Sequence, residues 1–124
     1  MAMKVEVRLD GPVKTVTLNR PEKRNALDAE MLDLLGAAFG DEPAKELRVA
    51  VIRAEGPSFC AGLDLRERTE SGPTAGASPI EAVLHRIEQY PLPVVAVVQG
   101  DAIAGGNELA LHCDFVVASE AARF

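Results

Sequence analysis

A glycine pair shortly before an acid is the feature of this sequence best suited to chemistry. Gly105 and Gly106 stand just ahead of Glu108, at the start of a predicted short helix. Glycines there leave main-chain N–H groups uncovered, and the helix dipole adds partial positive charge, so a developing oxyanion is favoured. Glu108 is expected to be buried beside Leu109 and Leu111, where an acid without a partner is costly. We interpret it as a catalytic acid; the alternative is tight helix packing with Glu108 in solvent.

Two further segments carry weaker signals of the same kind. Residues 60–65 read Cys-Ala-Gly-Leu-Asp-Leu, and Gly62 would let a main-chain N–H approach a ligand closely. The alternative is a simple bend stabilised by a turn hydrogen bond from Asp64. Lys23 and Arg24 form a basic loop that could hold phosphate, although such a loop can equally be a solvated connection.

Two other side chains are assigned no chemistry. His112 stands four residues after Glu108 and can share its helix face, but no second histidine completes a zinc-protease motif. We expect a structural histidine. Cys60 has no base at a telling spacing and is not expected to be a nucleophile.

The elements that position these residues alternate along the chain. Residues 4–19 alternate apolar and polar side chains around Gly11-Pro12 and predict a β-hairpin. Strands with uniformly apolar sequences are expected to be buried on both faces. After the hairpin we expect a helix from an Asp28 cap to Gly40, a strand over 48–54, a mobile surface loop over 70–78, a helix over 79–90, a strand over 94–98, the short Glu108 helix and a strand over 115–118. This order predicts an α/β layer with parallel pairing after the hairpin.

Composition limits the classes of function. A net charge of −6 and a pI near 4.9 argue against nucleic-acid or anionic-membrane partners. The two cysteines show no disulfide or zinc spacing, and no run of about 18 apolar residues predicts a membrane span. We expect one domain over residues 1–124, in the cytoplasm, with free thiols and no metal.

Taken together, three segments resemble the enoyl-CoA hydratase/isomerase (crotonase) family. They are residues 19–27, 59–65 and 100–114, and the resemblance spans about the N-terminal half of a typical member. It implies an α/β spiral of repeated ββα units, truncated here before the helical C-terminal part that builds trimers or paired trimers. A homo-oligomer is therefore expected.

The resemblance also implies a site. An acyl-CoA thioester, the substrate, would place its carbonyl oxygen between the N–H groups of Leu63 and Gly105, with Glu108 as acid/base; no further cofactor is implied. The positions that match the coenzyme A site are Lys23, Arg24, Ala26, Ala61, Gly62, Asp64, Leu65, Arg66 and Gly106. Ala104 replaces the first of the family's usual three glycines, a change expected to cost little.

The resemblance leaves the reaction open. In the hydratases a second acid follows the first by roughly twenty residues, beyond Phe124. Hydration of a trans-2-enoyl-CoA is the leading expectation, and an isomerase that needs a single glutamate is the second. A non-catalytic acyl-CoA-binding or assembly module is the third.

Overall fold

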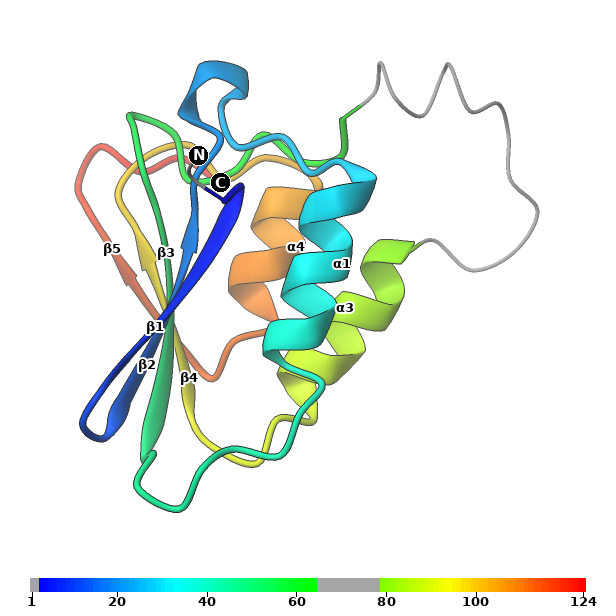
Figure 1. Cartoon of the computed structure of the whole chain (residues 1–124). Helices are drawn as coiled ribbons and strands as arrows, with labels where there is room; N and C mark the ends of the chain where they lie inside the picture. The colour runs from blue at the N-terminus through cyan, green and yellow to red at the C-terminus, as the bar shows by residue number, and fades with distance from the viewer. Residues whose placement is uncertain (1–2, 65–78) are drawn as a thin grey trace.

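In the computed structural model, residues 3–64 and 79–124 are described, and they form a five-stranded sheet with three α-helices on one face (Figure 1). The elements are β1 (Val5–Asp10), β2 (Val13–Leu18), the 3-10 turn η1 (Pro21–Lys23), α1 (Ala29–Ala38), β3 (Val49–Ala54), α3 (Pro79–Glu88), β4 (Val94–Val98), α4 (Gly105–Leu111) and β5 (Phe115–Ala118). The predicted hairpin and the alternation after it are confirmed. The predicted loop over 70–78 lies outside the described residues.

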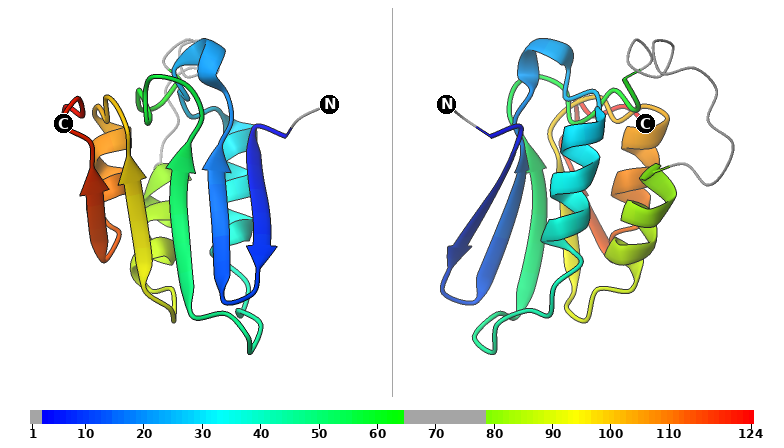
Figure 2. Two further views of the ribbon diagram at one scale, coloured as in Figure 1. Left: turned by 90° about the vertical axis from the view of Figure 1, so that its left-hand side faces the viewer. Right: turned by 45° about the vertical axis from the view of Figure 1, so that its right-hand side comes forward.

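The sheet follows chain order, β1-β2-β3-β4-β5. β1 pairs with β2 antiparallel, as in the predicted hairpin, and every later pair is parallel. Figure 2 shows the consequence: the carboxyl ends of β2 to β5 meet at one edge of the sheet. The loops after β2, β3 and β4 all leave from that edge, where ligands bind in open α/β sheets.

The core lies between the helices and the sheet. The inward side chains of β2, β3 and β4 are buried, and those of Val16, Ile52 and Val98 have no exposed surface. Met31 and Leu35 of α1 meet them with no exposed surface. Each such side chain contributes about 1.5–3 kcal/mol by leaving water.

The other face of the sheet is open, which corrects the expectation of strands buried on both faces. β3 alternates half-buried and buried residues, and Val97 of β4 is 38% exposed. No described element covers this face (Figure 2, left). The outward residues of β3 and β4 include valines like those inside, so residue type alone could not show which face is covered.

The start of α1 is fixed by Asp28. Its carboxylate accepts a hydrogen bond from the Met31 N–H at 2.9 Å, as an N-cap does, and pairs with Lys4 Nζ at 2.6 Å. Burial alone would raise the pKa of Asp28, but the bonds from Lys4 and Met31 outweigh it and hold that pKa below its usual 3.8.

We expect Asp28→Asn to keep the cap and to lose the charge pairing, about 0.5–1 kcal/mol of stability at pH 7. A folded-state pKa below the unfolded one means that this contribution is complete above about pH 4 and disappears as pH falls through the folded pKa. Urea unfolding at pH 7 and pH 3 checks this. The difference between the two pH values should be smaller in the variant than in the wild type; an equal difference would contradict the assignment.

Candidate active site

Three loops lie side by side at the carboxyl edge of the sheet. Residues 60–64, here called the middle loop, lie between the other two. The Leu27 N–H donates to the Gly62 carbonyl at 2.7 Å, and the Asp64 N–H donates to the Leu27 carbonyl at 2.9 Å. On its other side the Cys60 N–H donates to the Asp101 carbonyl at 3.1 Å. The middle loop is therefore held between the loops that follow β2 and β4.

The main chains of Leu63 and Gly105 approach one another at this point. In the parallel bridge between Leu27 and Leu63, Leu27 makes both hydrogen bonds, so the Leu63 N–H points away from it. A Cβ built on Gly62 would lie 3.3 Å from the Gly105 nitrogen, and one built on Gly105 would lie 3.6 Å from the Leu63 nitrogen. Within residues 3–64 and 79–124, neither N–H has a hydrogen-bond acceptor.

The glycines beside this pair have separate tasks. Gly62 has φ +96°, a left-handed conformation that favours glycine. A Cβ on Gly106 would lie 2.1 Å from the Cys60 carbonyl oxygen, so only glycine allows α4 to approach the middle loop this closely. The Gly106 N–H donates to the Ile103 carbonyl at 2.8 Å and is thus occupied. Gly106 therefore sets the packing of α4, and its predicted contact with substrate stays a prediction.

Ala104 precedes α4 with φ 50° and ψ −115°. A non-glycine residue in such a region stores about 1–3 kcal/mol of strain. The expectation that alanine costs little at this position is therefore wrong.

Glu108 lies in the first turn of α4, and its side chain is exposed. The expected burial is wrong, because the apolar neighbours Ile103 and Leu111 are themselves 45% and 64% exposed. His112 Nδ1 lies 2.7 Å from the Glu108 main-chain carbonyl oxygen. The histidine thus contacts the end of its own helix, in line with the structural role predicted for it.

Two of the residues expected to contact coenzyme A are joined directly, because the Ala61 N–H donates to the Arg24 carbonyl at 3.0 Å. Lys23 and Arg24 are exposed at η1, and Ala26 and Ala61 are half-buried beside the middle loop. Leu65 and Arg66 lie outside the described part of the chain.

Asp64 forms an ion pair that sequence reasoning did not predict. Its Oδ2 accepts from Arg20 Nη1 at 2.9 Å, across 44 residues of sequence. This pair is largely shielded, with 14% of the Arg20 side chain and 17% of the Asp64 side chain exposed.

Sequence reasoning missed two amides that hold the loop after β3. Asn25, fully buried, donates to the carbonyls of Glu55 at 2.9 Å and Ser58 at 3.0 Å. Gln99 donates to the same Ser58 carbonyl at 3.1 Å. Left-handed backbone at Asn25, φ 57°, is a conformation that asparagine tolerates, but nothing local reveals its distant partners.

Neither cysteine is suited to nucleophilic chemistry. Burial raises the pKa of the Cys60 thiol to about 11, although a hydrogen bond from the Gly62 main chain lowers it slightly. Its Sγ donates to the Asn25 carbonyl at 3.2 Å. Burial likewise raises the pKa of Cys113 to about 12, with Asp114 adding to the shift. A thiol that stays protonated is a poor nucleophile.

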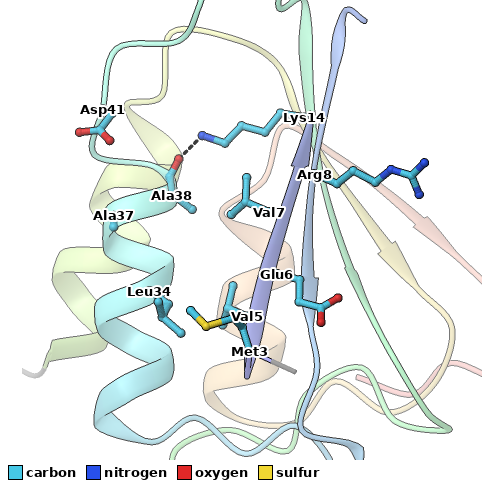
Figure 3. Close-up of a pocket in the computed structure, with 10 residues that line it drawn as sticks. All are labelled: Met3, Val5, Glu6, Val7, Arg8, Lys14, Leu34, Ala37, Ala38 and Asp41. Atoms are coloured by element: carbon cyan, nitrogen blue, oxygen red, sulfur yellow. Dashed lines mark hydrogen bonds between the residues drawn. The ribbon is translucent and has the colours of Figure 1, made fainter. Parts of the chain in front are cut away.

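A hollow of about 620 Å³ lies elsewhere, between β1 and α1 (Figure 3). Its lining includes Val5, Val7, Leu34 and Lys14 and none of the predicted site residues. The Lys14 amine is bound to the Ala38 carbonyl and lies 3.3 Å from the Tyr90 hydroxyl. We place the candidate site at the loops instead, because the main chains of Leu63 and Gly105 meet there and their N–H groups have no acceptor within residues 3–64 and 79–124.

Comparison with known proteins decides the family. Residues 9–124 match the sequence model of the enoyl-CoA hydratase/isomerase family. The chain belongs to this family. That membership confirms the resemblance carried by the three segments, over nearly the whole chain.

Relatives of this family show the same sequence and fold over part of their length. An enoyl-CoA isomerase/hydratase of Mycosarcoma maydis is 40% identical over 119 residues, 85% of this chain and 43% of that relative. An enoyl-CoA hydratase structure from Mycobacterium smegmatis has 38% identity and a TM-score of 0.86, covering 99% of this chain and 50% of that one. A Thermobifida fusca protein solved in complex with acetoacetyl-CoA has 29% identity and a TM-score of 0.80, covering 96% and 52%.

The predicted crotonase-like α/β fold is thereby confirmed. The chain spans about half the length of these relatives. Among residues 3–64 and 79–124, no helix is long and apolar enough to cross a membrane.

Proposed function

We propose that this chain carries the oxyanion site and one acid of an enoyl-CoA hydratase. The supporting observation is that the main chains of Leu63 and Gly105 meet, and that their N–H groups have no acceptor within residues 3–64 and 79–124. Glu108 follows Gly105 by about one helical turn in α4. The Thermobifida relative bound to acetoacetyl-CoA supports an acyl-CoA thioester as the ligand.

The two N–H groups would act on the thioester oxygen. As water adds to the β-carbon, the electrons of the double bond move onto that oxygen, and the negative charge develops between Leu63 and Gly105. Such donors stabilise the enolate more than the ground-state carbonyl, and losing one typically costs about 3–4 kcal/mol of barrier. Hydration needs one proton removed from the attacking water and one delivered to the α-carbon. Glu108 would carry out one of these transfers, and the second acid that the family resemblance implies would carry out the other.

An isomerase is the second candidate. There a single carboxylate removes a proton at one carbon and returns it at another, so Glu108 alone would suffice. The Mycosarcoma relative is named for both activities. A non-catalytic acyl-CoA-binding module is the third candidate, and it requires the same N–H pair without turnover.

Turnover of crotonyl-CoA tests the proposal. We expect loss of the conjugated thioester absorbance when the protein is added, with 3-hydroxybutyryl-CoA as the product. Binding of crotonyl-CoA without any loss of absorbance would favour the binding module. Conversion of a 3-enoyl-CoA to the conjugated isomer, without hydration, would favour the isomerase.

We also predict that the chain forms a homo-oligomer. Phe115 and Val117 are 62% and 59% exposed on β5, beside the 38% exposed Val97, and neighbouring apolar side chains of this kind favour association. Light scattering at micromolar concentration should give a mass above that of one chain. A monodisperse monomer would contradict the prediction. A cytoplasmic location and a single domain over residues 1–124 also stay predictions.

A further inference from the structure

Arg20 is a shielded side chain that connects two loops of the candidate site and has no role in the proposed reaction. It follows β2, and only 14% of its side chain is exposed. Its Nη1 donates to the Ala26 carbonyl at 3.0 Å and to Asp64 Oδ2 at 2.9 Å. The two hydrogens of one guanidinium nitrogen thus tie the loop after β2 to the residue that directly follows Leu63.

We propose that Arg20 is a positioning residue that, by tying Asp64 to Ala26, sets the direction of the Leu63 N–H. This inference rests on the proposed function, in which the Leu63 N–H binds the thioester oxygen. Arg20 itself would touch neither the substrate nor the reacting atoms.

The main chain around Leu63 needs such support. Gly62, just before it, has φ +96° and no side chain to restrict its rotation. Two main-chain hydrogen bonds, both made by Leu27, hold the segment on this side. The pair with Arg20 adds a charge-assisted bond one residue beyond Leu63, and such bonds are roughly twice as strong as neutral ones.

Arg20 is itself held in place. Its Nη1 lies 3.6 Å from Asp28 Oδ2, and Asp28 is fixed by capping α1 and by pairing with Lys4. Through Asp64, Arg20 and Asp28, the segment at Leu63 is connected to the first turn of α1. A planar guanidinium suits this better than a freely rotating ammonium group.

The first test is amide hydrogen exchange in Arg20→Gln. Exchange at the Leu27 and Asp64 amides, which form the Leu63 bridge, should become about tenfold faster or more through local opening. The Cys60 and Ile103 amides form the neighbouring bridge, between Cys60 and Ala102, and they should keep their exchange rates. Equal acceleration at both bridges, or none at either, would overturn the proposal.

A matched control is Arg53→Gln. Arg53 also pairs with an acid, Glu55 at 2.8 Å, but both side chains are exposed, 40% and 48%. We expect unchanged exchange at both bridges. If Arg20→Gln fails to fold, Asp64→Asn removes the charge from the other side of the same pair and should give the same selective pattern.

The second test compares acetoacetyl-CoA with coenzyme A, which lacks the acyl oxygen. The wild-type protein should prefer acetoacetyl-CoA; in Arg20→Gln that preference should fall about tenfold, since small misplacements of a binding group cost much. Affinity for coenzyme A should stay within about twofold, a split that a general loss of structure would not produce. Asp64→Asn should have little further effect in the Arg20→Gln background, because the two residues act as a unit.

The outcomes separate this inference from the proposed function. A wild-type protein without any preference for acetoacetyl-CoA would remove the proposed function and, with it, this role of Arg20. A wild-type preference that persists unchanged in Arg20→Gln would overturn the role of Arg20 alone.

Discussion

Replacing Glu108 by glutamine is expected to lower turnover of crotonyl-CoA by about 10²–10⁴-fold while acyl-CoA binding stays near normal. Glutamine has almost the same shape as glutamate but can neither accept nor deliver the proton that hydration requires. Glu108 is exposed on α4, so its replacement leaves the buried packing of Leu109 and Ala110 intact. Initial rates and the acyl-CoA dissociation constant, measured on the same preparation, check the expectation.

Glu88→Gln is the matched control. Glu88 is also an exposed helical acid, but it lies at the end of α3, away from the loops of the candidate site. Its turnover should equal that of the wild type. Full activity in Glu108→Gln would exclude Glu108 as the acid/base, and a parallel loss of binding would point to a role in substrate contact instead.

Gly106→Ala is expected to destabilise the protein strongly. The added Cβ would lie 2.1 Å from the Cys60 carbonyl oxygen and 2.8 Å from its carbonyl carbon, and these are main-chain atoms that cannot rotate away. Either α4 moves off the middle loop or that loop shifts. Overpacking of this severity costs about 3 kcal/mol. Thermal unfolding should show a decrease in melting temperature of roughly 10–20 °C for a chain of this size.

Gly11→Ala separates this clash from the general effect of adding a methyl group. Gly11 is in the β1–β2 turn with φ +56°, and nothing lies within 4 Å of the position of its Cβ. It should lose only about 1 kcal/mol, the cost of the left-handed backbone. A Gly106→Ala protein as stable as Gly11→Ala would show that α4 does not pack against Cys60 as described.

The same substitution also bears on the candidate site. Gly105 precedes Gly106, so a displaced α4 would carry the Gly105 N–H away from that of Leu63. We therefore expect any Gly106→Ala protein that remains folded to lose its preference for acetoacetyl-CoA over coenzyme A.

Local features of the sequence determined the elements and their order. Alternation in residues 5–10 and 13–18 indicated the hairpin, and Asp28 indicated the start of α1, because both signals act over a few residues. The three segments that resemble the family predicted that the chain belongs to it and has the crotonase fold. They also indicated that Leu63 and Gly105 should meet, and the structure brings their main chains together.

Only the tertiary structure decided what surrounds these residues. The open face of β3 and the exposure of Glu108 depend on where other elements lie. Neighbouring valines or leucines in the sequence do not indicate which face those elements cover. The pair of Arg20 with Asp64 and the contact of Gly106 with Cys60 join residues 44 and 46 positions apart. Such contacts exist only once the loops after β2, β3 and β4 meet at one edge of the sheet, which is a property of the packed chain rather than of any short stretch.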